Sequence, residues 1–201
     1  MQLRLFSAFA TVVLLGSATS RAQTGGIFKI HYASNLITSN PVVNMTNTGA
    51  SQTARGNICV NVYVFTPDEQ LQACCSAFLS PNALASYSIS RDLAFITLTP
   101  IVPPDVVIKL IATAAWGTTC PNSTAATVGN GKNVPVPGLL AWATALHALP
   151  GSPVTYGVTE TKFEDGIVSP SELARTTSLC ANILANGSGL GVCNVARIGG
   201  L

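Results

Sequence analysis

Apolar residues recur at every second position along several short segments of the chain. The clearest segment is 57–65, where every other residue is β-branched and apolar, namely Ile58, Val60, Val62 and Val64. Successive side chains of a strand point to opposite faces, so this period of two predicts a strand with an apolar face. Weaker forms of the pattern, separated by clusters of Pro, Gly and Asn, cover residues 27–32, 41–46, 85–90, 106–112, 139–147 and 154–161. The pattern therefore predicts about seven strands.

Residues 139–147 fit two interpretations, because Leu140, Trp142 and Leu146 suit a strand whereas the intervening alanines suit a helix. Prolines on both sides, at 135 and 137 before the segment and at 150 and 153 after it, confine it to the length of a strand. We interpret it as a strand.

A sharper helical signal lies near the C-terminus. Residues 169–172 read Ser-Pro-Ser-Glu, which offers a capping hydroxyl, a proline at the first helical position and a glutamate that can reach back to the exposed amide. One face then repeats at three- and four-residue spacing as far as Ile183, and Gly187 offers a left-handed stop. The similar runs at 66–69 and 80–82 predict single helical turns.

The first 22 residues have the three-part layout of a secretory signal peptide. Arg4 precedes an apolar run over residues 5–16, and a small, polar stretch ends at Ala22. The run is shorter than the roughly 20 apolar residues that a membrane-spanning helix needs, so we expect cleavage, between Ala22 and Gln23, and no membrane insertion afterwards. Residues 23–201 then form one secreted or cell-surface domain, with the periplasm as a further possibility.

Together these elements predict a mainly β fold. The expected architecture is a two-layer β-sandwich of about seven strands, with one C-terminal α-helix and short helical turns.

Charge is sparse, at 9% of residues. Arg4 and Arg21 leave with the signal peptide, so the mature chain carries eight basic and eight acidic residues. The sequence contains no cluster of Lys or Arg, so it lacks the positively charged patch that nucleic-acid binding requires. A surface of such low net charge does not oppose association between copies, so we expect self-assembly or an extracellular surface as the partner.

Six cysteines follow the predicted signal, an even number that indicates three disulfides in an exported chain. Spacing favours one bridge, between Cys180 on the predicted helix and Cys193 beyond the glycine-rich turn at 187–191. Separate partners are expected for Cys74 and Cys75, a bridge between these two being a minor option. The pairing is otherwise open among the remaining cysteines, which are Cys59, Cys74, Cys75 and Cys120. Metal-binding spacings are absent, so we predict no metal and no cofactor.

Recognisable catalytic motifs are missing from the sequence. The Gly-Ser-Gly run at 187–189 is no nucleophile elbow, and the Gly-Asn-Gly-Lys run at 129–132 lacks the residues of a phosphate-binding loop. Glu160 is the acid with the least obvious structural role, although a solvent-facing strand position explains it. An enzyme would need Glu160 to meet His147 or a second carboxylate in one pocket. We predict no catalytic residues.

Three stretches carry a resemblance to a known group of proteins. They are residues 57–65 running into 74–76, the segment 158–161, and residues 171–174 through 186–189 to Cys193. They resemble a family of uncharacterised secreted bacterial proteins, in which further cysteines often stand at the positions of Ala77 and near Ala196. The absence of both here fits the loss of one complete bridge. The resemblance implies export and disulfides, and it implies no activity.

These observations favour a secreted, non-catalytic structural or adhesion-type protein, which could assemble into a fibre or envelope. The alternative is a secreted hydrolase of polysaccharide or peptide. Residues 23–34, with alternating Phe28, Ile30 and Tyr32, suit either an ordinary first strand, which we prefer, or donation to the sheet edge of a neighbouring copy.

Overall fold

A computed structural model describes residues 26–95, 101–151 and 155–195. In these residues the chain forms nine strands in two antiparallel sheets and one α-helix, so the predicted mainly β fold is confirmed. The predicted signal peptide and its cleavage site between Ala22 and Gln23 lie outside the described residues.

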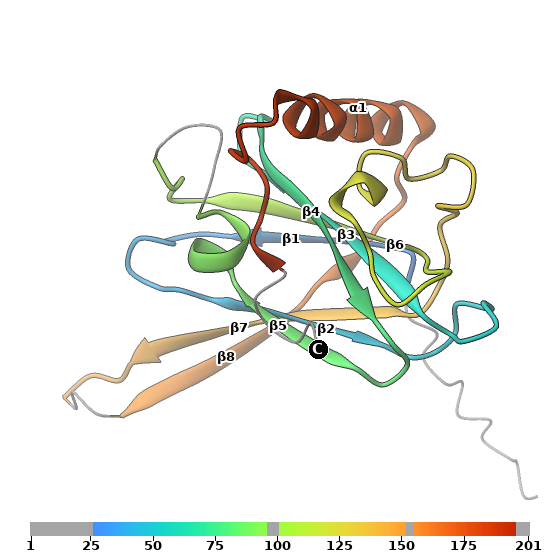
Figure 1. The fold of residues 1–201 in the computed structure, drawn as a ribbon. Coiled ribbons are helices and arrows are strands. Elements are labelled where there is room, and N and C mark those ends of the chain that lie inside the picture. Colours follow the sequence, from blue (N-terminus) through green and yellow to red (C-terminus); the bar gives the residue numbers. More distant parts are fainter. Residues whose placement is uncertain (1–25, 96–100, 152–154, 196–201) are drawn as a thin grey trace, which may run out of the picture.

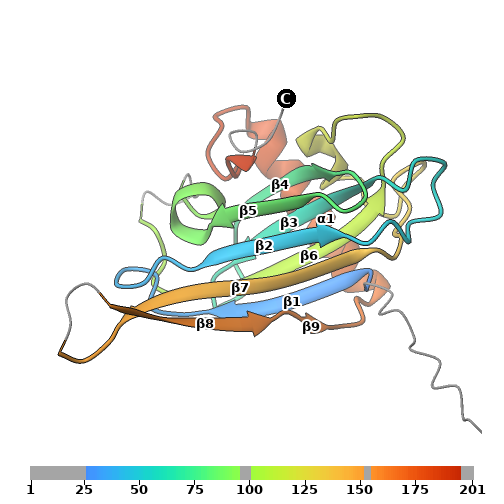
Figure 2. The ribbon, with the colours of Figure 1, turned by 90° about the horizontal axis from the view of Figure 1, so that it is seen from below.

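The two sheets face each other as a sandwich (Figures 1 and 2). In spatial order, the first sheet contains β4 (Leu71–Leu79), β3 (Ile58–Phe65), β6 (Val106–Ala114), β1 (Phe28–Ala33) and β9 (Glu164–Asp165). The second contains β5 (Leu84–Ser88), β2 (Val42–Asn47), β7 (Leu139–Ala148) and β8 (Tyr156–Lys162). Each of the seven predicted segments contains a strand, residues 139–147 among them, and residues 28–33 serve as an ordinary first strand paired with β6.

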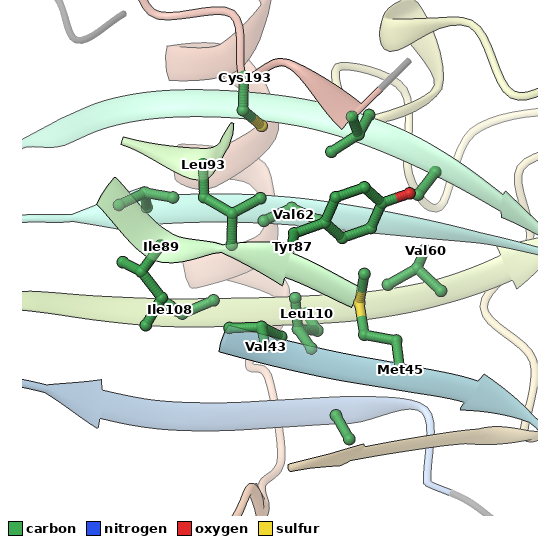
Figure 3. Packing of buried hydrophobic residues seen from close by; sticks show 14 of the residues in the cluster. Val43, Met45, Val60, Val62, Tyr87, Ile89, Leu93, Ile108, Leu110 and Cys193 are labelled. Carbon is green, nitrogen blue, oxygen red and sulfur yellow. The ribbon is translucent and has the colours of Figure 1, made fainter. Parts of the chain in front are cut away.

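Both faces of β3 are buried, which explains its sequence pattern. Val60 and Val62 point between the two sheets, where they pack with side chains of the second sheet such as Val43, Met45 and Tyr87 (Figure 3). Tyr63 and Phe65, at alternate positions of β3, enter a second apolar cluster on the outer face of the first sheet. The strand is therefore buried along its whole length.

The C-terminal helix, α1 (Pro170–Asn186), covers that outer face (Figure 1). The predicted cap is confirmed, since the Ser169 hydroxyl accepts a hydrogen bond from the Glu172 amide at 3.2 Å. Gly187 ends the helix in the left-handed region, at a φ of 68°. Ile183 and Cys180 are the buried apolar side chains of the helix, and they complete the second cluster.

Two predicted helical turns are hairpin turns instead, because an unpredicted strand, β4, lies between them. Residues 66–70 join β3 to β4, and residues 80–83 join β4 to β5. Glu69 and Asn82 adopt positive φ values of 65° and 63°, as a tight reversal of the chain requires. The predicted strand 85–90 also ends early, at Ser88, where a π-helical turn begins.

The favoured bridge between Cys180 and Cys193 is wrong. The chain forms Cys59–Cys120, Cys74–Cys180 and Cys75–Cys193. Because neighbouring residues of a strand point to opposite faces, Cys74 reaches the helix on the outer face while Cys75 lies in the core between the sheets. The two adjacent cysteines therefore fasten two successive parts of the C-terminal segment to β4.

The last strand crosses from one sheet to the other. β8 pairs with β7, the Phe163 amide still donates to the Ala141 carbonyl at 3.0 Å, and β9 then pairs with β1. At the crossing, the buried ammonium of Lys29 lies 2.6 Å from the carboxylate of Asp165. This ion pair joins the first strand to the last.

Candidate interaction surface

The acid and the histidine singled out in the sequence do not meet. Glu160 pairs with Thr144 across β8 and β7, and the Thr144 hydroxyl lies 3.5 Å from the Glu160 carboxylate, on the outer face of the second sheet. His147 is three residues further along β7, so it points to the opposite face. Both side chains are exposed. Glu160 and His147 therefore do not form the shared pocket that a hydrolase would need.

Several other acids of the described residues are held by structural partners. Glu172 bonds Lys109 at 2.5 Å, and Arg175 lies between Glu172 and Glu69. Burial opposes ionisation of Glu172, but the hydrogen bond and charge of Lys109, with the charge of Arg175, outweigh it and lower the pKa of the carboxyl. A carboxyl in this state is ionised at neutral pH, which suits an ion pair and not a proton donor.

A groove of about 500 Å³ lies between the β3–β4 turn and α1. Its floor is apolar, with Leu71, Leu179 and Ile183, and its cation is Arg175. The guanidinium already donates to the carbonyl of Glu69 at 3.0 Å and pairs with its carboxylate. The groove therefore has no uncommitted charge with which to select a ligand.

Exposed apolar side chains gather at one end of the sandwich. Residues 34–41 meet residues 94–95 and 101–105 there, with a hydrogen bond from the Leu36 amide to the Pro104 carbonyl at 2.9 Å, and both views place the β7–β8 hairpin at the same end (Figures 1 and 2). Of the fourteen large hydrophobic residues exposed in the described part of the chain, seven lie on these segments: Ile37, Phe95, Ile101, Leu146, Leu149, Tyr156 and Val158. Tyr32, which is also exposed, lies close to residues 34–41 near the end of β1. Such a concentration is typical of an interaction site.

The hairpin itself extends beyond the sandwich. The first residue of β2, Val42, pairs with Thr144, so β7 has no strand on that side from residue 145 onward. In this extension Leu146, Tyr156 and Val158 are each more than half exposed. A two-stranded ribbon with neither face covered is marginally stable in water, so its exposed apolar residues indicate a partner.

Four strands stand at the edges of the two sheets, and one of them, β9, is only two residues long. Of the other three edges, two are protected. On β4 the Cys74 amide donates to the Gly191 carbonyl at 2.8 Å, and the Ser76 amide donates to the Asn122 side chain at 3.1 Å. On β5 the Ser88 amide donates to the Asp92 carboxylate at 2.8 Å. Within the described ranges, β8 ends its sheet with no such cover. Native proteins normally blunt exposed edges, so the open edge of β8 is a second indication of a partner.

Comparisons with known proteins add no relative. No family model matches the chain, and neither the curated proteins nor the solved structures contain a significant match. Among the described residues, no helix has the length and apolar character to cross a membrane. All six cysteines are paired in disulfides, which is compatible with an extracellular protein.

The sequence reasoning did not identify this surface. Its residues come from two loop segments and a hairpin that meet only in the folded chain, and single exposed apolar residues are ordinary in any sequence. One signal was available. Tyr156 and Val158 alternate with polar residues in a segment that contains both Glu160 and Lys162, which is the pattern of a strand outside the core.

Proposed function

We propose that this chain is a secreted, non-catalytic structural or cell-surface protein of the adhesion type, which acts by presenting its apolar end to another macromolecule. The observation that carries the proposal is the concentration of exposed apolar side chains on residues 34–41, 94–95 and 101–105 and on the extended hairpin. Burying such residues against a partner is favourable by about 25 cal/mol for each Å² removed from water.

The scaffold also suits this role. Three disulfides tie distant parts of the chain together, over separations of 61, 106 and 118 residues, and they hold the body rigid while the end makes contact. The second apolar cluster, the helix and the ion pairs are all accounted for by stability. The hydrolase alternative gains no support from the positions of Glu160 and His147.

The test measures binding of fluorescently labelled mature protein to cells of the native host and to their insoluble extracellular matrix. Serine at Ile37 and Phe95, which are 80% and 63% exposed, should reduce the bound fraction severalfold. Leu84→Ser is the matched control, because Leu84 is 60% exposed at the start of β5, away from the apolar end, and this variant should bind normally. Absence of binding to both materials, or equal loss in the control, would refute the proposal.

A further inference from the structure

We infer that the occupant of the open edge of β8 is the β8 strand of a second copy of this chain. The inference deepens the proposed function and rests on it, because it names a partner for part of the same surface. The two copies would join antiparallel about a twofold axis through Thr159. Their second sheets would become one continuous sheet of eight strands.

The backbone of β8 offers hydrogen-bonding groups for this contact. The Phe163 amide points toward β7, where it donates to the Ala141 carbonyl. Because the amides of successive strand residues point alternately to the two sides of the strand, those of the odd-numbered residues of β8 also face β7. Those of Tyr156, Val158, Glu160 and Lys162 face outward along the edge. The strand contains no proline, and every residue except Gly157 is exposed. A second strand can therefore pair along the whole of β8.

The side chains favour the register centred on Thr159. In an antiparallel pair, outward-facing residues must lie opposite each other, so Tyr156 meets Lys162 of the other copy and Val158 meets its Glu160. The ammonium then lies beside an aromatic ring, and no like charges are opposed. A register centred on Glu160 would set the two carboxylates against each other, and one centred on Thr161 would leave Tyr156 uncovered.

The distribution of charge on β8 indicates that the partner is a second copy of this chain. Glu160 and Lys162 stand two residues apart on the same face of β8, and neither belongs to an ion pair within the described part of the chain. The strand is thus neutral and self-complementary. The mature chain has eight basic and eight acidic residues, so long-range repulsion between copies is small.

The experiment is sedimentation equilibrium of the mature, oxidised protein over a range of concentrations. The wild-type chain should form a reversible dimer. Val158→Glu places a carboxylate opposite Glu160 of the other copy twice in each dimer, so it should weaken the dimer about tenfold or more. The double variant Val158→Glu/Glu160→Lys restores opposite charges across the contact and should recover most of the affinity. Thermal unfolding of each variant checks that the fold is unchanged.

A wild-type protein that stays monomeric to millimolar concentration would overturn the inference. So would a dimer that Val158→Glu leaves intact, or one that the double variant fails to restore, since the contact would then lie elsewhere. These outcomes are separate from the adhesion test. A monomer that still binds cells through Ile37 and Phe95 contradicts only the dimer, and a dimer that binds no surface contradicts only the proposed function.

Discussion

At the scale of single residues, the described core is organised around a few buried polar side chains. Asn61, in the middle of β3, is fully buried, and its amide donates to the Ile111 carbonyl at 3.0 Å and the Thr113 hydroxyl at 3.1 Å. Its oxygen accepts from the Ser76 hydroxyl at 2.7 Å. One side chain therefore links β3 to both neighbouring strands, so it fixes their register as well as their spacing.

Replacing Asn61 by leucine should lower the free energy of unfolding by about 1–3 kcal/mol, because the Ser76 hydroxyl and the Ile111 carbonyl lose buried partners. Urea denaturation of the purified protein measures the change. The double variant Asn61→Leu/Ser76→Ala removes one orphaned group and should recover part of the loss. Equal stability of the two variants would show that Ser76 does not depend on Asn61.

A second residue-scale prediction concerns the ion pair at the crossing between the sheets. Lys29 is 1% exposed whereas Asp165 is 58% exposed, so the lysine depends on the pair more than the aspartate does. Asp165→Asn should destabilise the protein by about 2 kcal/mol, below the cost of breaking a fully buried pair, because water reaches the aspartate. The double variant Asp165→Asn/Lys29→Met should recover most of the lost stability, as measured by thermal unfolding. If Asp165→Asn proves neutral, the pair does not hold the crossing together.

At the scale of elements, β4 is the strand on which the C-terminal part of the chain depends. Cys74 holds α1, and Cys75 holds the segment that follows it. The same segment adds main-chain bonds to the edge of β4, including that from the Cys74 amide to Gly191. The helix and the tail are thus fastened independently.

Removal of one fastening should leave the other intact. In the variant Cys75→Ala/Cys193→Ala, the free energy of unfolding should fall by about 3–5 kcal/mol, since that bridge closes a loop of 118 residues. Thiol titration under denaturing conditions should detect no free sulfhydryl, because Cys74–Cys180 and Cys59–Cys120 remain. Free thiols in this variant would contradict the pairing.

The elements also show where the sequence was informative. The helix at 170–186 was predictable because its cap, its apolar face and its stop are all local signals. The strand β3 was predictable because its β-branched residues alternate. By contrast, β4 reads Leu-Gln-Ala-Cys-Cys-Ser-Ala-Phe-Leu, with no β-branched residue and no alternation, because both of its faces are buried. Proline and acidic residues before it imitate a helix cap.

The disulfides and the interaction surface required long-range information. The pair Cys180–Cys193 was favoured because the two cysteines are close in sequence, but each pairs instead with a cysteine more than a hundred residues away. Once β4 is known to be a strand, opposite directions for Cys74 and Cys75 follow from its geometry. The protected edges of β4 and β5, against which the open edge of β8 stands out, are likewise visible only in the folded chain.

At the scale of the whole molecule, the described titrating groups predict how stability varies with pH. Burial lowers the pKa of His31, which stacks on Phe163 with ring centroids 4.7 Å apart. Below an ordinary value of 6.5, the unfolded chain therefore binds a proton that the folded chain resists, and stability falls. The lowered pKa of Glu172 extends the loss as the pH drops through its ordinary value of 4.5.

The alkaline side is set mainly by Tyr63, whose hydroxyl donates to the Ala125 carbonyl at 2.6 Å. Burial raises its pKa, so above an ordinary value of 10.0 the unfolded chain loses a proton that the folded chain keeps, and stability falls again. The pKa of Tyr87 is also raised, by burial and by the charge of Asp92, and this shift acts in the same direction. The thermal midpoint should therefore be highest between about pH 7 and 9. His31→Gln should flatten the decline between about pH 7 and 5.5 without altering the alkaline side. A wild-type midpoint that is constant from neutral pH down to that value would contradict the role of His31, because the folded and unfolded chains would then bind the same number of protons.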